Sequence, residues 1–80
     1  MAPSAVKRDA RAIDVRVTDD ALQVVLADGR EVSAPVAWSP RLAYATRKQR
    51  KNWRLVGRGQ GIRWPDVDED ISVASLLRVG

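Results

Sequence analysis

Hydrophobic and polar residues alternate along the N-terminal part of the chain, a pattern typical of half-buried strands. The stretch 12–17 reads AIDVRV, and the stretch 22–27 reads LQVVLA. Asp28-Gly29 predicts a two-residue hairpin turn, because Gly adopts a positive φ without penalty, and 30–36 then returns as a third strand. The residues of the first strand expected to share one face are Ile13, Val15 and Val17. We therefore predict a three-stranded antiparallel meander.

The middle of the chain changes to a helical pattern. The Ser-Pro pair at 39–40 favours a helix start, because Ser caps free N–H groups and Pro fits the first turn. This short helix is expected to end near Ala45. Thr46 and Gln49 have the spacing of a capping box, which predicts a second short helix over 47–53.

The C-terminal third combines turn residues with a last apolar pattern. Glycines at 57, 59 and 61 predict a turn between two short strands. Ser72 is expected to cap a terminal helix over 73–79, whose apolar face would hold Val73, Leu76 and Leu77. The fold class predicted is α+β: a small antiparallel β-meander of about three N-terminal strands plus a C-terminal hairpin, two short central helices and a short C-terminal helix. Residues 1–11 are expected to form a flexible N-terminal segment, and 12–80 a single α+β domain.

Composition excludes several kinds of catalytic and metal-binding chemistry. The chain has 80 residues, with neither Cys nor His. Disulfides, thiolate nucleophiles, imidazole bases and the common zinc ligand sets are thereby excluded. No apolar run approaches the roughly 18 residues of a membrane span, and the first ten residues lack the apolar core of a secretory signal. We expect a cytoplasmic protein without membrane association.

Charge is distributed unevenly along the sequence. Residues 41–63 hold eight basic side chains and no acidic one, a net charge of +8, whereas 64–80 carry a net charge of −3. Such asymmetry can mark a surface for nucleic acid or for an acidic partner. The candidate contact residues are Arg41, Arg47, Lys48, Arg50, Lys51, Arg54, Arg58 and Arg63. The alternative is that some of them pair with the downstream acids, which are themselves candidate acidic contacts: Asp66, Asp68, Glu69 and Asp70.

Four of the basic residues are predicted to form one patch on the second helix. Arg47, Arg50 and Lys51 share a helical face by their spacing, and Lys48 lies to one side of it. Cations in the first turn of a helix oppose its dipole, so this patch breaks a local rule.

Two motifs suggest ligand sites but lack the context these need. The glycines at 57–61 are followed by a short extended run and Pro65, not by the helix that a phosphate loop requires. The acidic run from Asp66 places Ile71 and Leu77 where a calcium loop needs Gly and Glu. We expect no cofactor, no metal site and no enzymatic activity.

The aromatic residues have two interpretations. Trp38, Trp53 and Trp64 could stack on bases. In a chain without Phe, however, large Trp side chains are natural core residues. We favour the core for Trp53 and Trp64, while Trp38 is compatible with either role.

The order of motifs resembles the bacterial domain-of-unknown-function family 2442. The resemblance extends from about Ile13 to Leu77, and its most specific part is the run Trp-Pro-Asp-x-Asp-Glu-Asp-Ile at 64–71. Members of that family are small α+β domains, some fused to a helix-turn-helix and some encoded beside a second small domain in toxin–antitoxin-like pairs. The resemblance implies a non-enzymatic partner-binding or regulatory module with no established catalytic residue. Arg-Lys at 47–48 stands where the family commonly has Pro-Glu, which strengthens the basic patch here.

Two function classes follow from these observations. The first is a protein-binding or regulatory module, most concretely the antitoxin-like member of a two-gene pair. The alternative is a nucleic-acid-binding accessory protein that uses the basic segment 41–63. An enzyme is disfavoured because the sequence offers no nucleophile–base pair.

Overall fold

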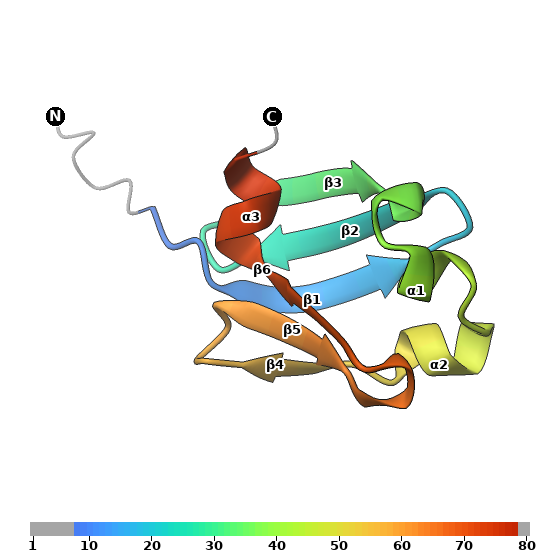
Figure 1. Cartoon of the computed structure of the whole chain (residues 1–80). Coiled ribbons are helices and arrows are strands. Elements are labelled where there is room, and N and C mark those ends of the chain that lie inside the picture. Colours follow the sequence, from blue (N-terminus) through green and yellow to red (C-terminus); the bar gives the residue numbers. More distant parts are fainter. Residues whose placement is uncertain (1–7, 79–80) are drawn as a thin grey trace, which may run out of the picture.

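Six strands and three short helices make up the structure, a computed structural model that describes residues 8–78. The elements in chain order are β1 (Ala12–Val17), β2 (Ala21–Leu26), β3 (Glu31–Pro35), α1 (Pro40–Ala43), α2 (Arg47–Lys51), β4 (Arg54–Val56), β5 (Gly61–Trp64), β6 (Glu69–Ser72) and α3 (Val73–Arg78). Two 3₁₀ turns, Val36–Trp38 and Pro65–Val67, precede α1 and β6. The strands form two antiparallel sheets, sheet A in the order β1-β2-β3 and sheet B in the order β4-β5-β6 (Figure 1). The predicted α+β class is confirmed.

Sheet A is the predicted meander. The central strand buries Leu22, Val24 and Leu26 on one face, as the alternation of its sequence requires. Its hairpin loop is one residue longer than predicted. Leu26 N–H donates to the Arg30 carbonyl at 2.8 Å, and Gly29 N–H donates to the Leu26 carbonyl at 3.0 Å. The loop therefore has three residues, with Gly29 at a φ of +92° in the position that favours glycine.

The first strand contains a bulge that changes which residues face the core. Ala12 pairs with Leu26 and Asp14 with Val25, so Ile13 has no partner of its own in the ladder. An extra residue of this kind interrupts the two-residue alternation. Ala12 is consequently buried and Ile13 is 55% exposed. The prediction that Ile13 faces inward was wrong; Val15 is buried and Val17 half-buried, as predicted.

Sheet B is larger than the predicted C-terminal hairpin. The turn at 57–60 joins β4 to β5 as expected, but β6 adds a third strand from the acidic segment that follows Pro65, for which no strand was predicted. Glu69 and Ile71 are half-buried while Asp70 and Ser72 are exposed. This alternation lets an acid-rich segment form an edge strand. The two sheets touch where Ala12 N–H donates to the Gly59 carbonyl at 2.7 Å.

The helices begin where their caps were predicted. Ser39 Oγ accepts from Leu42 N–H at the start of α1. Thr46 and Gln49 form a reciprocal capping box at the start of α2. The second helix ends at Lys51, two residues before the predicted end at 53. Ser72 Oγ accepts from Ser75 N–H at 3.1 Å at the start of α3.

The core lies between the two sheets and beneath α3, which crosses the inner face of sheet A (Figure 1). Trp64, from β5, is completely buried, and its indole N–H donates to the Arg50 carbonyl at 3.1 Å. Trp53 is only half-buried and packs against this core. In α3, Val73 is buried whereas Leu77 is 39% exposed.

The structured part of the chain begins before the predicted boundary at 12. Asp9 N–H donates to Asp28 Oδ2 at 3.0 Å, and Arg11 C=O accepts from Ala27 N–H at 2.8 Å. These contacts hold 9–11 against the β2–β3 loop. The rest of the predicted flexible segment, 1–7, and the helix end expected at Val79 lie outside the described residues.

Replacement of the buried tryptophan should nearly abolish folding. Trp64→Ala removes a completely buried side chain and is expected to lower the free energy of unfolding by about 3–5 kcal/mol. That is most of the stability of a domain this small. Trp53→Ala, at a half-buried position, should cost about 1–3 kcal/mol. Urea denaturation followed by circular dichroism measures both values, and equal losses would contradict the different burial of the two side chains.

The contact between the sheets should make Gly59 intolerant of a side chain. Gly59 has a φ of +84°, and a Cβ atom there would lie 2.8 Å from the Ala12 carbonyl oxygen. Gly59→Ala should therefore cost about 2–5 kcal/mol through backbone strain and overpacking. Gly29→Ala is the matched control, because its φ is +92° and no atom lies within 4 Å of the added Cβ. That variant should lose only about 1–2 kcal/mol. Equal losses in urea denaturation would count against the close contact.

Candidate functional site

The basic segment does not form one surface, because Arg50 lies inside the protein. Only 9% of the surface of Arg50 is exposed to solvent. The guanidinium donates from Nε to the Leu42 carbonyl at 3.0 Å, from Nη2 to the Ala43 carbonyl at 3.0 Å and from Nη1 to Asp19 Oδ1 at 2.7 Å. Two of these partners are carbonyls at the C-terminal end of α1, where backbone acceptors lack helical partners. Arg50 thus has a structural role and leaves the candidate contact set.

Two further cations pair with the acidic stretch, as the alternative interpretation expected. Arg63 donates to Asp68 Oδ1 at 2.8 Å and to Asp70 Oδ2 at 2.7 Å. Arg41 donates to the Asp68 backbone carbonyl, and its Nη1 lies 3.9 Å from Asp68 Oδ2. These contacts raise the pKa of Arg63 and lower that of Asp68, in each case chiefly through the hydrogen bond that the two share.

The other two acidic candidates also have partners within the domain. Asp66 Oδ2 accepts from Asn52 Nδ2 at 3.0 Å. Glu69 Oε2 accepts from Ser39 Oγ at 2.6 Å, a contact that joins β6 to the start of α1. The four acids therefore act mainly as internal partners, and the structure does not gather them into a separate contact surface.

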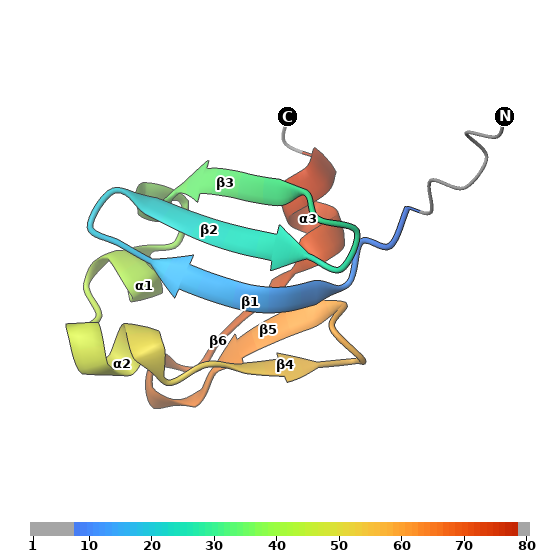
Figure 2. The same ribbon diagram turned by 180° about the vertical axis from the view of Figure 1, so that it is seen from behind.

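Five exposed cations remain, and we call them the basic strip: Arg47, Lys48, Lys51, Arg54 and Arg58. No ion pair of theirs exists within residues 8–78. They follow one another along α2, β4 and the turn into β5, which lie in sequence along one side of the molecule (Figure 2). The strip extends the predicted four-residue patch to the end of the β4–β5 hairpin.

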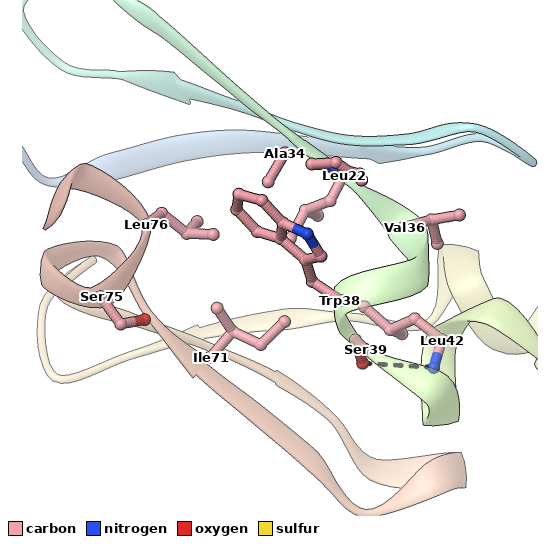
Figure 3. A pocket seen from close by; sticks show the side chains of 10 residues that line it. Leu22, Ala34, Val36, Trp38, Ser39, Leu42, Ile71, Ser75 and Leu76 are labelled. Atoms are coloured by element: carbon pink, nitrogen blue, oxygen red, sulfur yellow. Dashed lines mark hydrogen bonds between the residues drawn. The ribbon is translucent and has the colours of Figure 1, made fainter. Parts of the chain in front are cut away.

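An apolar pocket lies on the other side of β6. Its volume is about 210 Å³, and Figure 3 shows the Trp38 indole above it, between Leu76 and Leu22. Trp38 is 57% exposed, so the structure places it at the rim of a pocket and outside the core. The polar side chains in the lining are those of Ser39 and Ser75.

Ser39, which lines the pocket, donates to the Glu69 carboxylate, but it is only 7% exposed and its hydroxyl also caps α1. Within residues 8–78, no three acidic side chains are placed to share a metal ion. No helix in the described part of the chain is long and apolar enough to cross a membrane.

Two antiparallel three-stranded sheets and three short helices define a small α+β domain. The chain belongs to the family described as "Protein of unknown function (DUF2442)", whose model matches residues 12–79. The predicted family membership is thus confirmed.

The fold is similar to that of a solved structure. The crystal structure of a protein of unknown function from Rhodospirillum rubrum matches with a TM-score of 0.75 and 24% sequence identity. The match covers 91% of this chain and 89% of that chain. At this identity the likeness shows the fold alone. No match was found among curated proteins.

Sequence reasoning missed an exposed apolar group beside the basic strip. Leu55 on β4 is 36% exposed and lies near Ile13 on β1, which is 55% exposed; Val56 is also 36% exposed but lies on the opposite face of sheet B. The alternation of β1 predicted the opposite orientation for Ile13, because the bulge that turns this residue outward depends on pairing with β2. The shortness of β4, three residues with none buried, likewise emerges only in the folded sheet.

Acid should destabilise the domain. Hydrogen bonds from Arg11 lower the pKa of Asp9 from 3.8 to about 2, and hydrogen bonds from Arg50 and Arg30 lower the pKa values of Asp19 and Asp28. Because the pKa values of these three carboxyl groups are lower in the folded than in the unfolded state, their ionised forms stabilise the fold at pH values above the unfolded pKa. This stabilisation is lost as the pH falls through the folded values, between about pH 4 and pH 2.

The measurement is the urea midpoint at a series of pH values. We expect it to be nearly constant from pH 7 to about pH 5 and to fall below about pH 4. Asp9→Asn should reduce the fall, and added salt should weaken the exposed pairs. A midpoint that rises on acidification to about pH 2.5 would contradict this linkage.

Proposed function

We propose that this domain is a non-enzymatic module that binds an acidic partner protein through the basic strip. The observation that carries the proposal is the division of the cations. Arg41, Arg50 and Arg63 have partners within the domain. The five residues of the basic strip have no ion-pair partner among the described residues and follow one another along α2, β4 and the turn into β5.

Such a distribution suits association with a negatively charged surface. Clustered, unpaired charges steer a complementary partner and raise its association rate. The desolvation penalty is small, because exposed side chains at the rim of a contact keep part of their hydration. The exposed apolar side chains of Ile13 and Leu55, which lie together beside the strip, supply the area that charges alone do not.

Nucleic-acid binding is the second candidate, supported by the same five cations. The helix that carries Arg47, Lys48 and Lys51 has only five residues, which is short for an element that reads a groove. The exposed Trp38 lies at the apolar pocket, away from the cations, so it offers them no stacking platform. These features favour the protein partner.

The biological role we propose rests on the family resemblance. A domain that binds a partner without catalysis fits a regulatory module, and the paired-gene arrangement of family members suggests the antitoxin-like member of such a pair. A cytoplasmic location is part of the same proposal.

Retention of a partner should depend on the basic strip. The tagged protein is incubated with nuclease-treated extract of its own organism, and retained proteins are quantified by mass spectrometry. We expect an acidic protein to be retained by the wild type and reduced at least about tenfold in Arg47→Gln/Lys48→Gln/Lys51→Gln. The matched control is Arg8→Gln/Arg16→Gln/Arg78→Gln, which removes three exposed cations outside the strip and should retain the partner normally.

A parallel titration addresses the second candidate. Binding to a 20-base-pair duplex and a 20-nucleotide single strand should be no tighter than the roughly 10⁻⁴–10⁻⁶ M of non-specific association at physiological salt. Sub-micromolar binding that is lost in the strip variant, with the fold intact, would replace the protein-binding function by the nucleic-acid one. Equal retention of every protein by both triple variants would refute the role of the strip.

A further inference from the structure

The outer side of β4 is an open sheet edge. In sheet B, β4 pairs with β5 on one side and has no strand on the other among residues 8–78. All three of its residues are exposed. An open edge offers backbone donors and acceptors to an incoming strand.

The hydrogen-bond pattern of sheet B identifies which backbone groups face outward. Val73 N–H donates to the Gln60 carbonyl at 2.9 Å, so Gln60 directs its backbone groups toward β6. Successive residues of an antiparallel strand direct these groups to opposite sides. Gly61 and Arg63 therefore direct theirs toward β4.

The residues opposite these two on β4 are Val56 and Arg54. They complete the ladder with β5, and Leu55 between them directs its N–H and C=O to the open side. One directly opposed residue of an incoming antiparallel strand would accept from this N–H and donate to this C=O. No other partner for these two groups exists among the described residues.

The two faces beside this edge differ in chemistry. Leu55 lies with Ile13, Arg58 and Gly59 around a surface hollow of about 390 Å³, so this face offers an apolar contact between β4 and β1. Arg54 lies on the opposite face, because side chains alternate along a strand. An added strand would meet apolar side chains on one face and a guanidinium on the other.

Positive charge is present along the whole length of the edge. Lys51 precedes β4 at the end of α2, Arg54 begins the strand, and Arg58 lies in the turn that follows; Figure 2 shows α2 and that turn at opposite ends of β4. Arg58 has a φ of +57°, a conformation that costs a non-glycine residue stability. Pairing of two copies through β4 would bring these like charges together, which disfavours self-association.

We propose that an extended acidic segment of a partner protein adds to β4 as a fourth strand of sheet B. Its apolar side chains cover Leu55 and Ile13 on one face, its carboxylates meet Arg54 on the opposite face, and Lys51 and Arg58 lie near its two ends. The inference rests on the proposed function and specifies the binding mode. Sequence specificity comes from the alternation of acidic and apolar residues in the partner.

The probe is a capped seven-residue peptide in which Glu and Val alternate, titrated into ¹⁵N-labelled protein. Two variants at one position separate backbone pairing from side-chain contact. Leu55→Pro removes the outward N–H without removing a β5 ladder bond, whereas Leu55→Ala keeps that N–H and removes the side chain. We expect the peptide to shift the amide signals of β4 and to slow exchange of the Leu55 amide about tenfold at saturation. Its affinity should fall at least about tenfold in Leu55→Pro and less in Leu55→Ala.

Two further probes keep the test independent of how well Leu55→Pro folds. A peptide of the same sequence with alternate N-methyl groups on its pairing edge keeps its charge but loses backbone donors, and it should bind at least about tenfold more weakly. A Lys-Val peptide tests charge complementarity and should not bind. Arg54→Gln/Arg58→Gln should weaken the Glu-Val peptide and make its binding less dependent on salt.

Several results would overturn the inference. Equal binding of the normal and N-methylated peptides would show a purely electrostatic contact, as would unchanged affinity in a folded Leu55→Pro. Absence of peptide binding, together with dimerisation of Arg54→Gln/Arg58→Gln, would show that the cations only protect the edge from self-pairing. Displacement of the peptide by a single-stranded oligonucleotide at equal affinity would assign the edge to nucleic acid.

These failures differ from a failure of the proposed function. If the Glu-Val peptide does not bind but the extract experiment still retains an acidic protein through the basic strip, strand addition is wrong and protein binding stands. If neither is observed, both are wrong.

Discussion

The buried guanidinium of Arg50 joins three parts of the chain that are distant in sequence. The guanidinium donates to the Asp19 carboxylate in the β1–β2 turn and to the carbonyls of Leu42 and Ala43 at the end of α1. The backbone carbonyl of Arg50 accepts the indole N–H of Trp64. Removal of the Arg50 side chain withdraws its donors from the Leu42 and Ala43 carbonyls, and a partly buried acceptor that loses a donor costs more than the bond itself contributes. The position of α2 relative to both sheets depends on this junction.

The exposed charge follows from the same junction. With Arg50 turned inward, its helix neighbours Arg47, Lys48 and Lys51 remain at the surface, since residues on one short helix cannot all face the core. Only Asn52 and Trp53 separate Lys51 from β4, so the cations of the helix continue into those of the strand and its turn. The five cations therefore follow the path of the chain along the open edge of sheet B.

The close approach of the two sheets completes this surface. Gly59 permits the β4–β5 turn to touch β1 at Ala12, and the bulge beside it directs Ile13 outward, near Leu55. The hollow at Ile13 and Leu55 therefore lies next to the cations of β4 and its turn. Acidic side chains that could have neutralised the cations are used elsewhere, with Asp68 and Asp70 on Arg63 and Glu69 on Ser39.

The sequence by itself determined the local structure: the meander, the caps at Ser39, Thr46 and Ser72, and the turn at 57–60. Each of these features depends on residues within a few positions of one another. The calcium and phosphate motifs could be rejected from the sequence for the same reason, because each needs specific residues or a helix directly beside it. Only the tertiary structure decided that Arg50 is buried, that Ile13 is exposed and that β6 completes a second sheet. The burial of Arg50 depends in part on Asp19, which is 31 residues away, and the exposure of Ile13 depends on the register of β1 against β2. No local pattern encodes such pairing, because the spatial neighbours are distant in sequence.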